Sequence, residues 1–150
     1  MKKYLFIPAV LLIIIFFFII LINIDANHIK PYILIDGKKF EVEIAKTDAQ
    51  KEKGLAKYNK ISNNFAMEFP FEKAGYYAIW MKDMKFSIDI IYINKNKIVQ
   101  IFKNVPYPKS DNKSLTIYKP DVPADLVLEI NGGLSQKYNF KKGDSVKIVY

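Results

Sequence analysis

The first 22 residues place the strongest constraint on how this chain can fold. Lys2 and Lys3 are followed by an apolar run from Tyr4 to Ile22 that contains no charged side chain. As a helix, these roughly 19 residues are about 28 Å long, close to the thickness of the hydrocarbon core of a bilayer. The run therefore predicts one N-terminal transmembrane helix that contacts the membrane through residues 4–22.

We expect residues 1–24 to remain as an uncleaved membrane anchor, with a cleaved signal peptide as the alternative. A signal peptide usually has a shorter apolar core and a small-x-small cleavage site, to which Ile24-Asp25-Ala26 is a poor match. The positive-inside rule keeps the two N-terminal lysines in the cytoplasm. We therefore predict a tether over residues 25–31 and an extracytoplasmic domain over residues 32–150, which would be secreted if the anchor were cleaved.

The composition excludes several classes of function. The net charge is +8, and the chain has neither arginine nor cysteine. Without arginine, nucleic acid is not an expected partner, and the lysine excess fits a solvated surface or loose attraction to an anionic polymer or lipid. Without cysteine, disulfides, thiolate catalysis and cysteine zinc sites are excluded. The only histidine, His28, lies in the tether without partner residues, so we expect no metal site and no cofactor.

The remaining residues show the pattern of short β-strands. Asp36-Gly37 is a strong hairpin turn signal, and Phe40, Val42 and Ile44 alternate with charged residues in the second arm. Further strands are expected over residues 76–81, 86–93, 97–102, 125–131 and 145–150, with a possible short strand at residues 115–118 and an apolar segment over residues 65–71 that ends around Pro70. A capping box begins at Thr47 and predicts a short helix, and a second helical stretch follows Gly132-Gly133. We expect a mainly β (α+β) fold, a compact barrel-like or strongly curved antiparallel sheet of about seven strands with two short helices.

The order of motifs resembles the family called domain of unknown function 192, over roughly residues 42–149. The blocks that carry the resemblance are Trp80-Met81-Lys82-Asp83-Met84, Ile88-Asp89-Ile90, Asn104-Val105-Pro106, Val127-Leu128-Glu129-Ile130-Asn131-Gly132-Gly133 and Lys142-Gly143-Asp144-Ser145-Val146. Members often carry an N-terminal export signal, and their biochemical role is not established, so the resemblance implies a fold and no activity. This chain departs from the family pattern at Lys57-Tyr58, where an arginine is usual, at Asp83-Met84 and at Ser87.

Asp89 is the first candidate for chemistry, because its carboxyl group lies in an apolar strand. A buried carboxylate needs a partner, and Lys82 is the nearest candidate. The structural alternatives are a buried ion pair or a turn-capping carboxylate, and the functional one is a general base or ligand contact. A Ser87–Lys82 nucleophilic pair is conceivable, but nothing in the spacing requires it.

The candidate ligand-binding residues are aromatic or polar side chains near the motif blocks. They are Trp80, Lys82, Asp83, Asp89, Asn104, Tyr107, Tyr118 and Glu129. Strand alternation would place Trp80 and Lys82 on one face. Trp80 is expected to belong to the core or, if exposed, to stack on a sugar with Tyr107 or Tyr118, and Glu129 is expected to be solvated or paired.

Three functions are compatible with these residues. The first is a non-catalytic binding module for a glycan, an anionic envelope polymer or a partner protein near the membrane. The second is an enzyme that acts on a saccharide or envelope substrate through Asp89 with Lys82. The third is an accessory subunit of a membrane assembly. The sequence does not indicate the oligomeric state.

Overall fold

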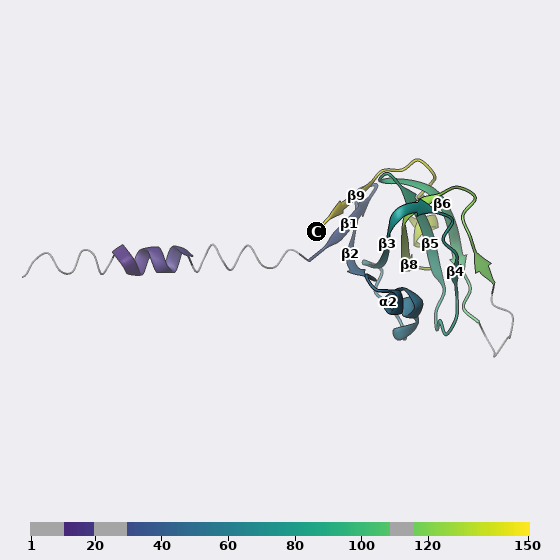
Figure 1. Cartoon of the computed structure of the whole chain (residues 1–150), viewed down its shortest axis with the longest axis horizontal. Helices are drawn as coiled ribbons and strands as arrows, with labels where there is room; N and C mark the ends of the chain where they lie inside the picture. The colour runs from purple at the N-terminus through teal and green to yellow at the C-terminus, as the bar shows by residue number, and fades with distance from the viewer. Residues whose placement is uncertain (1–10, 20–29, 109–115) are drawn as a thin grey trace, which may run out of the picture. The chain divides into compact units, whose positions relative to one another are not determined.

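A computed structural model describes residues 11–19, 30–108 and 116–150 and divides the chain into two units, Met1–Lys30 and Pro31–Tyr150. In the first unit, residues 11–19 are helical with exposed side chains (purple in Figure 1). Within the described residues, no helix is both long enough and apolar enough to span a bilayer. The rest of the expected span over residues 4–22 lies outside the described residues.

The second unit is mainly β (Figure 1). Its strands are β1 (Tyr32–Ile35), β2 (Lys38–Ile44), β3 (Phe65–Gly75), β4 (Ile79–Trp80), β5 (Ile88–Asn94), β6 (Lys97–Val105), β7 (Ile117–Tyr118), β8 (Ala124–Asn131) and β9 (Val146–Val149). Its short helices are α2 (Asp48–Lys53), the 3₁₀ turn η1 (Gly54–Lys57) and α3 (Leu134–Lys137). The expected hairpin is present, with Asp36 and Gly37 at φ values of 46° and 74°, as a two-residue turn of this type requires.

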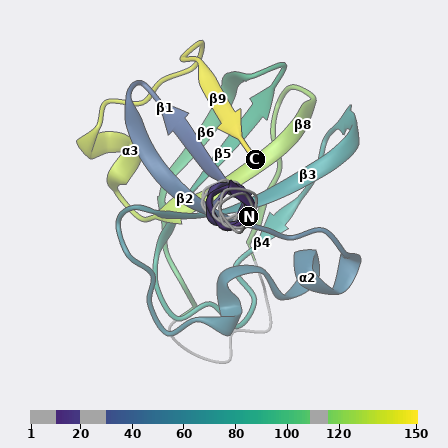
Figure 2. The same ribbon diagram turned by 90° about the vertical axis from the view of Figure 1, so that its left-hand side faces the viewer.

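Seven strands form one curled sheet in the order β6-β5-β8-β3-β2-β1-β9, and β4 pairs with β7 in a separate ribbon. The two edges of the curled sheet meet at one end (Figure 2), where Ile98 exchanges backbone hydrogen bonds of 3.0 and 2.8 Å with Asp144 and Gly143. The expectation of a strongly curved sheet of about seven strands with few short helices is therefore confirmed.

Two details differ from the expected architecture. The sheet is not wholly antiparallel, because β2 and β3 are parallel; α2 and η1 form the crossover connection that a parallel pair needs. The apolar segment expected to end around Pro70 is part of β3, which continues to Gly75 with a register shift against β8 after Pro70. Proline lacks the N–H of a regular ladder, which accounts for an irregularity at this point. Of the strand expected over residues 76–81, only the two residues of β4 are in a strand.

The central strands β5 and β8 are buried on both faces; residues 86–93 are apolar on both faces apart from Ser87 and Asp89, which is typical of a central strand. One face contributes to a core that contains Phe40, Ile91 and Leu128. The opposite face packs in a second core that contains Leu55 of η1 and Ile90. The candidate site opens onto this second core.

Candidate functional site

A pocket of about 230 Å³ lies between the α2–η1 segment, the β4 region and the sheet. It combines an apolar interior with lysines and aromatic rings. The lining residues are Lys51, Glu52, Lys53, Gly54, Leu55, Phe69, Phe71, Tyr77, Ala78, Ile79, Trp80, Lys82, Met84 and Glu129. Of the residues singled out from the sequence, the pocket brings together Trp80, Lys82 and Glu129.

Glu129 lies in the pocket on the second-core face of β8, where its cross-strand neighbours are Met67 and Ile90. The residue is only 5% exposed. Among the described residues, none donates a hydrogen bond to its carboxyl group, and burial raises its pKa to about 8. This corrects the expectation that Glu129 is solvated or paired. No described residue competes for the carboxyl oxygens, and Glu129 lines the pocket, so a molecule in the pocket can hydrogen-bond to them.

Aromatic side chains form one wall of the pocket. Tyr77 stacks on Phe71 with a centroid distance of 3.5 Å and an interplanar angle of 6°. The Nζ atom of Lys51 lies 4.6 Å from the centroid of the Phe71 ring, a cation–π geometry. Trp80 is 47% exposed. It is therefore not a core residue, and its indole is available at the rim of the pocket.

Tyr92 holds this aromatic wall in place from beneath. Its side chain is fully buried, and its hydroxyl lies 3.0 Å from the carbonyl oxygen of Tyr77 and 2.9 Å from that of Tyr118, so it can donate to one of them at a time. Burial, with a further contribution from Glu129, raises the pKa of Tyr92 well above its usual range. The hydroxyl therefore remains a donor that ties the β4–β7 ribbon to the sheet.

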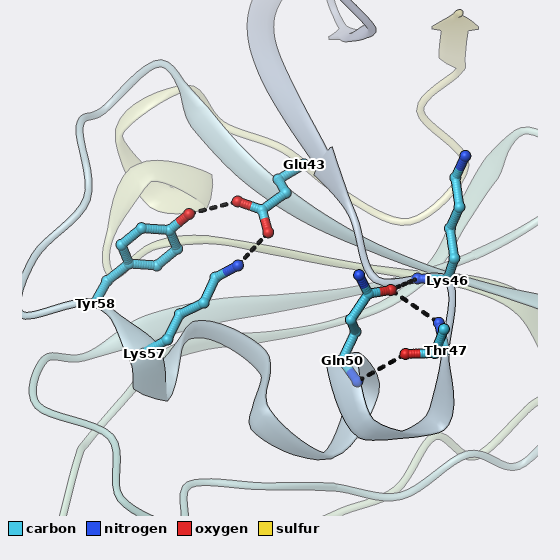
Figure 3. A network of polar contacts seen from close by, with 6 residues as sticks. All are labelled: Glu43, Lys46, Thr47, Gln50, Lys57 and Tyr58. Carbon is cyan, nitrogen blue, oxygen red and sulfur yellow. Dashed lines mark hydrogen bonds and ion pairs between the residues drawn. The ribbon is translucent and has the colours of Figure 1, made fainter.

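The opposite wall is the α2–η1 segment, which polar contacts attach to β2 (Figure 3). The predicted capping box is present: Gln50 N–H donates to Thr47 Oγ1 at 3.2 Å, and Thr47 N–H donates to Gln50 Oε1 at 2.9 Å. Glu43 accepts hydrogen bonds from Lys57 and Tyr58. Lys57-Tyr58, the departure from the family pattern, thus anchors this wall.

The charges around Glu43 favour this attachment near neutral pH. Partial burial opposes ionisation of Glu43, but the hydrogen bonds from Lys57 and Tyr58 outweigh it and lower the pKa of the carboxyl group. The same contact with Glu43 raises the pKa of Lys57. Both groups are about 40% exposed, so solvent screens their attraction and the pair fixes geometry more than it adds stability.

Asp89 does not contribute to the pocket. It is fully buried and pairs with Ile130 in the register of β5 and β8, whereas Glu129 pairs with Ile90, so the two acids project from opposite faces of the sheet. Its carboxyl group accepts backbone N–H bonds of 2.6, 2.8 and 2.6 Å from Asn104, Gly133 and Ser135. Asp89 is thus a capping carboxylate, and the expected pairing with Lys82 is wrong. The proposed Asp89–Lys82 catalytic arrangement is not assembled.

The remaining candidates also lie outside the pocket. Asp83 and Asn104 are exposed and have positive φ values of 57° and 50°. Tyr107 is exposed after β6, and Tyr118 packs edge-on against Phe102 with a centroid distance of 5.4 Å.

Two pairings suggested by the sequence are not formed. Tyr118 pairs with Ile79, and Trp80 pairs with Ile117, so Trp80 and Tyr118 face opposite sides of their ribbon. Ser87 does not line the pocket that contains Lys82. Its carbonyl oxygen accepts a hydrogen bond of 3.0 Å from the N–H of Gly132.

Several pocket residues had no signal of function in the sequence. Lys51 and Lys53 lie in the predicted short helix, where lysines ordinarily face solvent, and Gly54 was expected only to end that helix. Gly54 has φ +48°, and a Cβ atom built on it would lie 3.9 Å from Glu129 Oε2. A glycine here both permits the backbone turn and leaves the carboxyl group uncovered.

Comparison with solved structures supports the architecture. A protein of unknown function from Novosphingobium aromaticivorans DSM 12444 has 28% sequence identity and a TM-score of 0.69, covering 77% of this chain and 83% of its own. A protein from Sinorhizobium meliloti 1021, provisionally described as a transcription regulator, has 24% identity and a TM-score of 0.68, covering 79% and 91% respectively. The latter likeness shows the fold alone. No curated protein matches the sequence significantly.

A family model described as DUF192, Uncharacterized ACR, matches residues 32–148. The match includes the whole site, from Lys51 to Glu129, and the resemblance seen in the motif blocks is confirmed.

Proposed function

We propose that this chain, which belongs to the DUF192 family, binds one sugar unit of a glycan or anionic envelope polymer in the pocket around Glu129, without catalysis. The observation that supports this most strongly is that Glu129, a largely buried residue whose carboxyl group has no hydrogen-bond partner among the described residues, lines a pocket together with the exposed indole of Trp80.

The dimensions of the pocket favour a small polar ligand. Its volume of about 230 Å³ is below the range of roughly 300–1,000 Å³ that is typical for drug-sized ligands. A single ring of a polymer can enter such a space while the adjoining units stay in solvent. The open position of Trp80 at the rim suits a chain that continues beyond the pocket.

The chemistry of the lining fits a sugar ring. An aromatic side chain offers a flat apolar surface for the C–H face of the ring, and a carboxyl group can bond to hydroxyl or other oxygen atoms. Lys51, Lys53 and Lys82 line the same pocket and attract negatively charged ligands. A partner protein that presents an acidic side chain would use the same features. Titration with saccharides and with acidic peptides distinguishes these two classes of ligand.

We propose that the N-terminal apolar run from Tyr4 to Ile22 holds the domain at the outer surface of a membrane. Its support is the length of the uncharged sequence and the two preceding lysines. Protease added to intact cells or spheroplasts is expected to digest the domain of residues 32–150. Complete protection, with digestion only after lysis, would contradict this orientation.

Substitution of Trp80 tests the binding site. We expect Trp80→Ala to weaken binding of an oligogalacturonide or of a phosphodiester-linked galactose oligomer at least tenfold, or about 1.4 kcal/mol, because the stacking surface is removed. The measurement is isothermal titration calorimetry of the full chain near pH 6.

Tyr107→Ala is the matched control, because Tyr107 is an exposed aromatic residue that does not line the pocket. It should bind like the wild type. Equal losses in the two variants, or no saccharide binding by the wild type, would contradict the proposed function; binding of acidic peptides instead would favour a protein partner.

A further inference from the structure

We infer that Glu129 binds as the neutral acid and donates its proton in a hydrogen bond to an anionic oxygen of the ligand, so that the pocket selects acidic sugars over neutral ones. This inference rests on the proposed function and specifies the ligand class and the pH control of the same site.

The surroundings of Glu129 define its protonation state. Leu55 and Phe69 are buried neighbours in the pocket lining, and none of the described residues donates a hydrogen bond to the carboxyl group. An ionised carboxylate in such surroundings lacks the compensation that burial demands. The neutral form carries one O–H donor, and this donor needs an acceptor that the described residues do not supply.

The charged groups that share the pocket make an anionic acceptor the best match. Lys51, Glu52 and Lys53 face it from α2, and Lys82 follows β4. The other titratable neighbours are the hydroxyls of Tyr77, in the lining, and of Tyr92, on β5 beneath it. Three lysines against one glutamate leave a positive rim while Glu129 is neutral. The lysines attract the anion, and the carboxyl group fixes its position.

The carboxyl group is accessible because residue 54 has no side chain. A Cβ atom at Gly54 would lie 3.9 Å from Glu129 Oε2 and 3.5 Å from the ring of Phe69. Any larger side chain would extend into the approach to the carboxyl group.

The pH dependence of binding tests this inference. The full chain is titrated at pH 7 and pH 9 with three probes: an oligogalacturonide, a phosphodiester-linked galactose oligomer and a neutral galactose oligomer. Because the pKa of Glu129 is about 8, its protonated fraction falls about tenfold over this interval. We expect the affinity for an acidic probe to fall by about the same factor and the neutral probe to bind more weakly at pH 7. The two acidic probes distinguish a carboxylate from a phosphate acceptor.

Two variants of Glu129 and one control make the outcome specific. Glu129→Gln keeps an N–H donor and should bind equally at both pH values, whereas Glu129→Leu should bind at least tenfold more weakly at pH 7. Glu41→Gln, which changes an exposed glutamate of β2 outside the pocket lining, should retain the wild-type pH dependence. If the wild type binds but the loss at pH 9 is missing or persists in Glu129→Gln, the inference fails and the proposed function stands. If the wild type binds none of the probes, both fail.

Discussion

We expect Asp89→Ala to lower the free energy of unfolding by about 4 kcal/mol or more, and Asp89→Asn by about 2–3 kcal/mol. The carboxyl group accepts three short backbone hydrogen bonds, one buried and two part-buried, and an N–H left unsatisfied costs about 1–3 kcal/mol, most where it is buried. Asparagine retains only one acceptor oxygen and places an NH₂ group against a donor. Urea-induced unfolding of the full chain, followed by tryptophan fluorescence, measures the loss.

The contacts of Asp89 explain why one residue has so large an effect. They join the end of β6 to the Gly132-Gly133 turn and the adjoining helix α3, which are far from β6 in sequence. Asp83→Asn is the control, because Asp83 is exposed in a turn and should change stability by less than about 0.5 kcal/mol. Loss of less than 1 kcal/mol in Asp89→Ala would show that these contacts do not hold the turn.

Glu129→Gln is expected to remove a pH dependence of stability that the wild type shows. The pKa of Glu129 is about 8 in the folded chain against a reference value of 4.5. Between these values the folded state binds more protons than the unfolded state, so stability falls as pH rises. At about 1.4 kcal/mol per unit, the wild type should lose about 3–5 kcal/mol between pH 4.5 and pH 8 relative to Glu129→Gln.

The comparison with a variant isolates this contribution from that of other groups. Burial also raises the pKa of Glu68, with partial compensation by the hydrogen bond from Tyr150, and this effect cancels because both proteins carry it. Glu52→Gln changes an exposed glutamate of the same pocket and should leave the wild-type slope unaltered. Parallel stability curves for the wild type and Glu129→Gln from pH 5 to pH 9 would mean that Glu129 ionises normally.

Local signals predicted much of the fold. The Asp36-Gly37 turn and the Thr47 capping box depend on neighbouring residues, so both could be identified directly. The burial of β5 on both faces followed from the apolar residues that flank Asp89 on both faces of the strand. The parallel pairing of β2 with β3 could not be foreseen, because it depends on where the crossover through α2 and η1 returns the chain. The extension of β3 beyond Pro70 likewise depends on β8, which is distant in sequence.

The candidate site was predicted only in part, for a related reason. Trp80 and Lys82 were identified because alternation along a short segment places them on one side. Glu129 was misassigned because a polar residue that alternates with Leu128 and Ile130 normally faces solvent. Here that face is covered by η1 and the β4 region, which sequence periodicity does not reveal. Asp89 stood out for its apolar neighbours, yet its partners are backbone N–H groups that leave no sequence signature.

The site depends on one physical claim, that the Glu129 carboxyl group is buried, unpaired and neutral beside an open pocket. Carbon-13 NMR of the side-chain carboxyl carbon of Glu129, assigned by comparison with Glu129→Gln and followed from pH 4 to pH 10, measures its ionisation directly. The structure predicts a midpoint near pH 8. A midpoint near 4.5, the value of an ordinary solvated glutamate, would contradict the account.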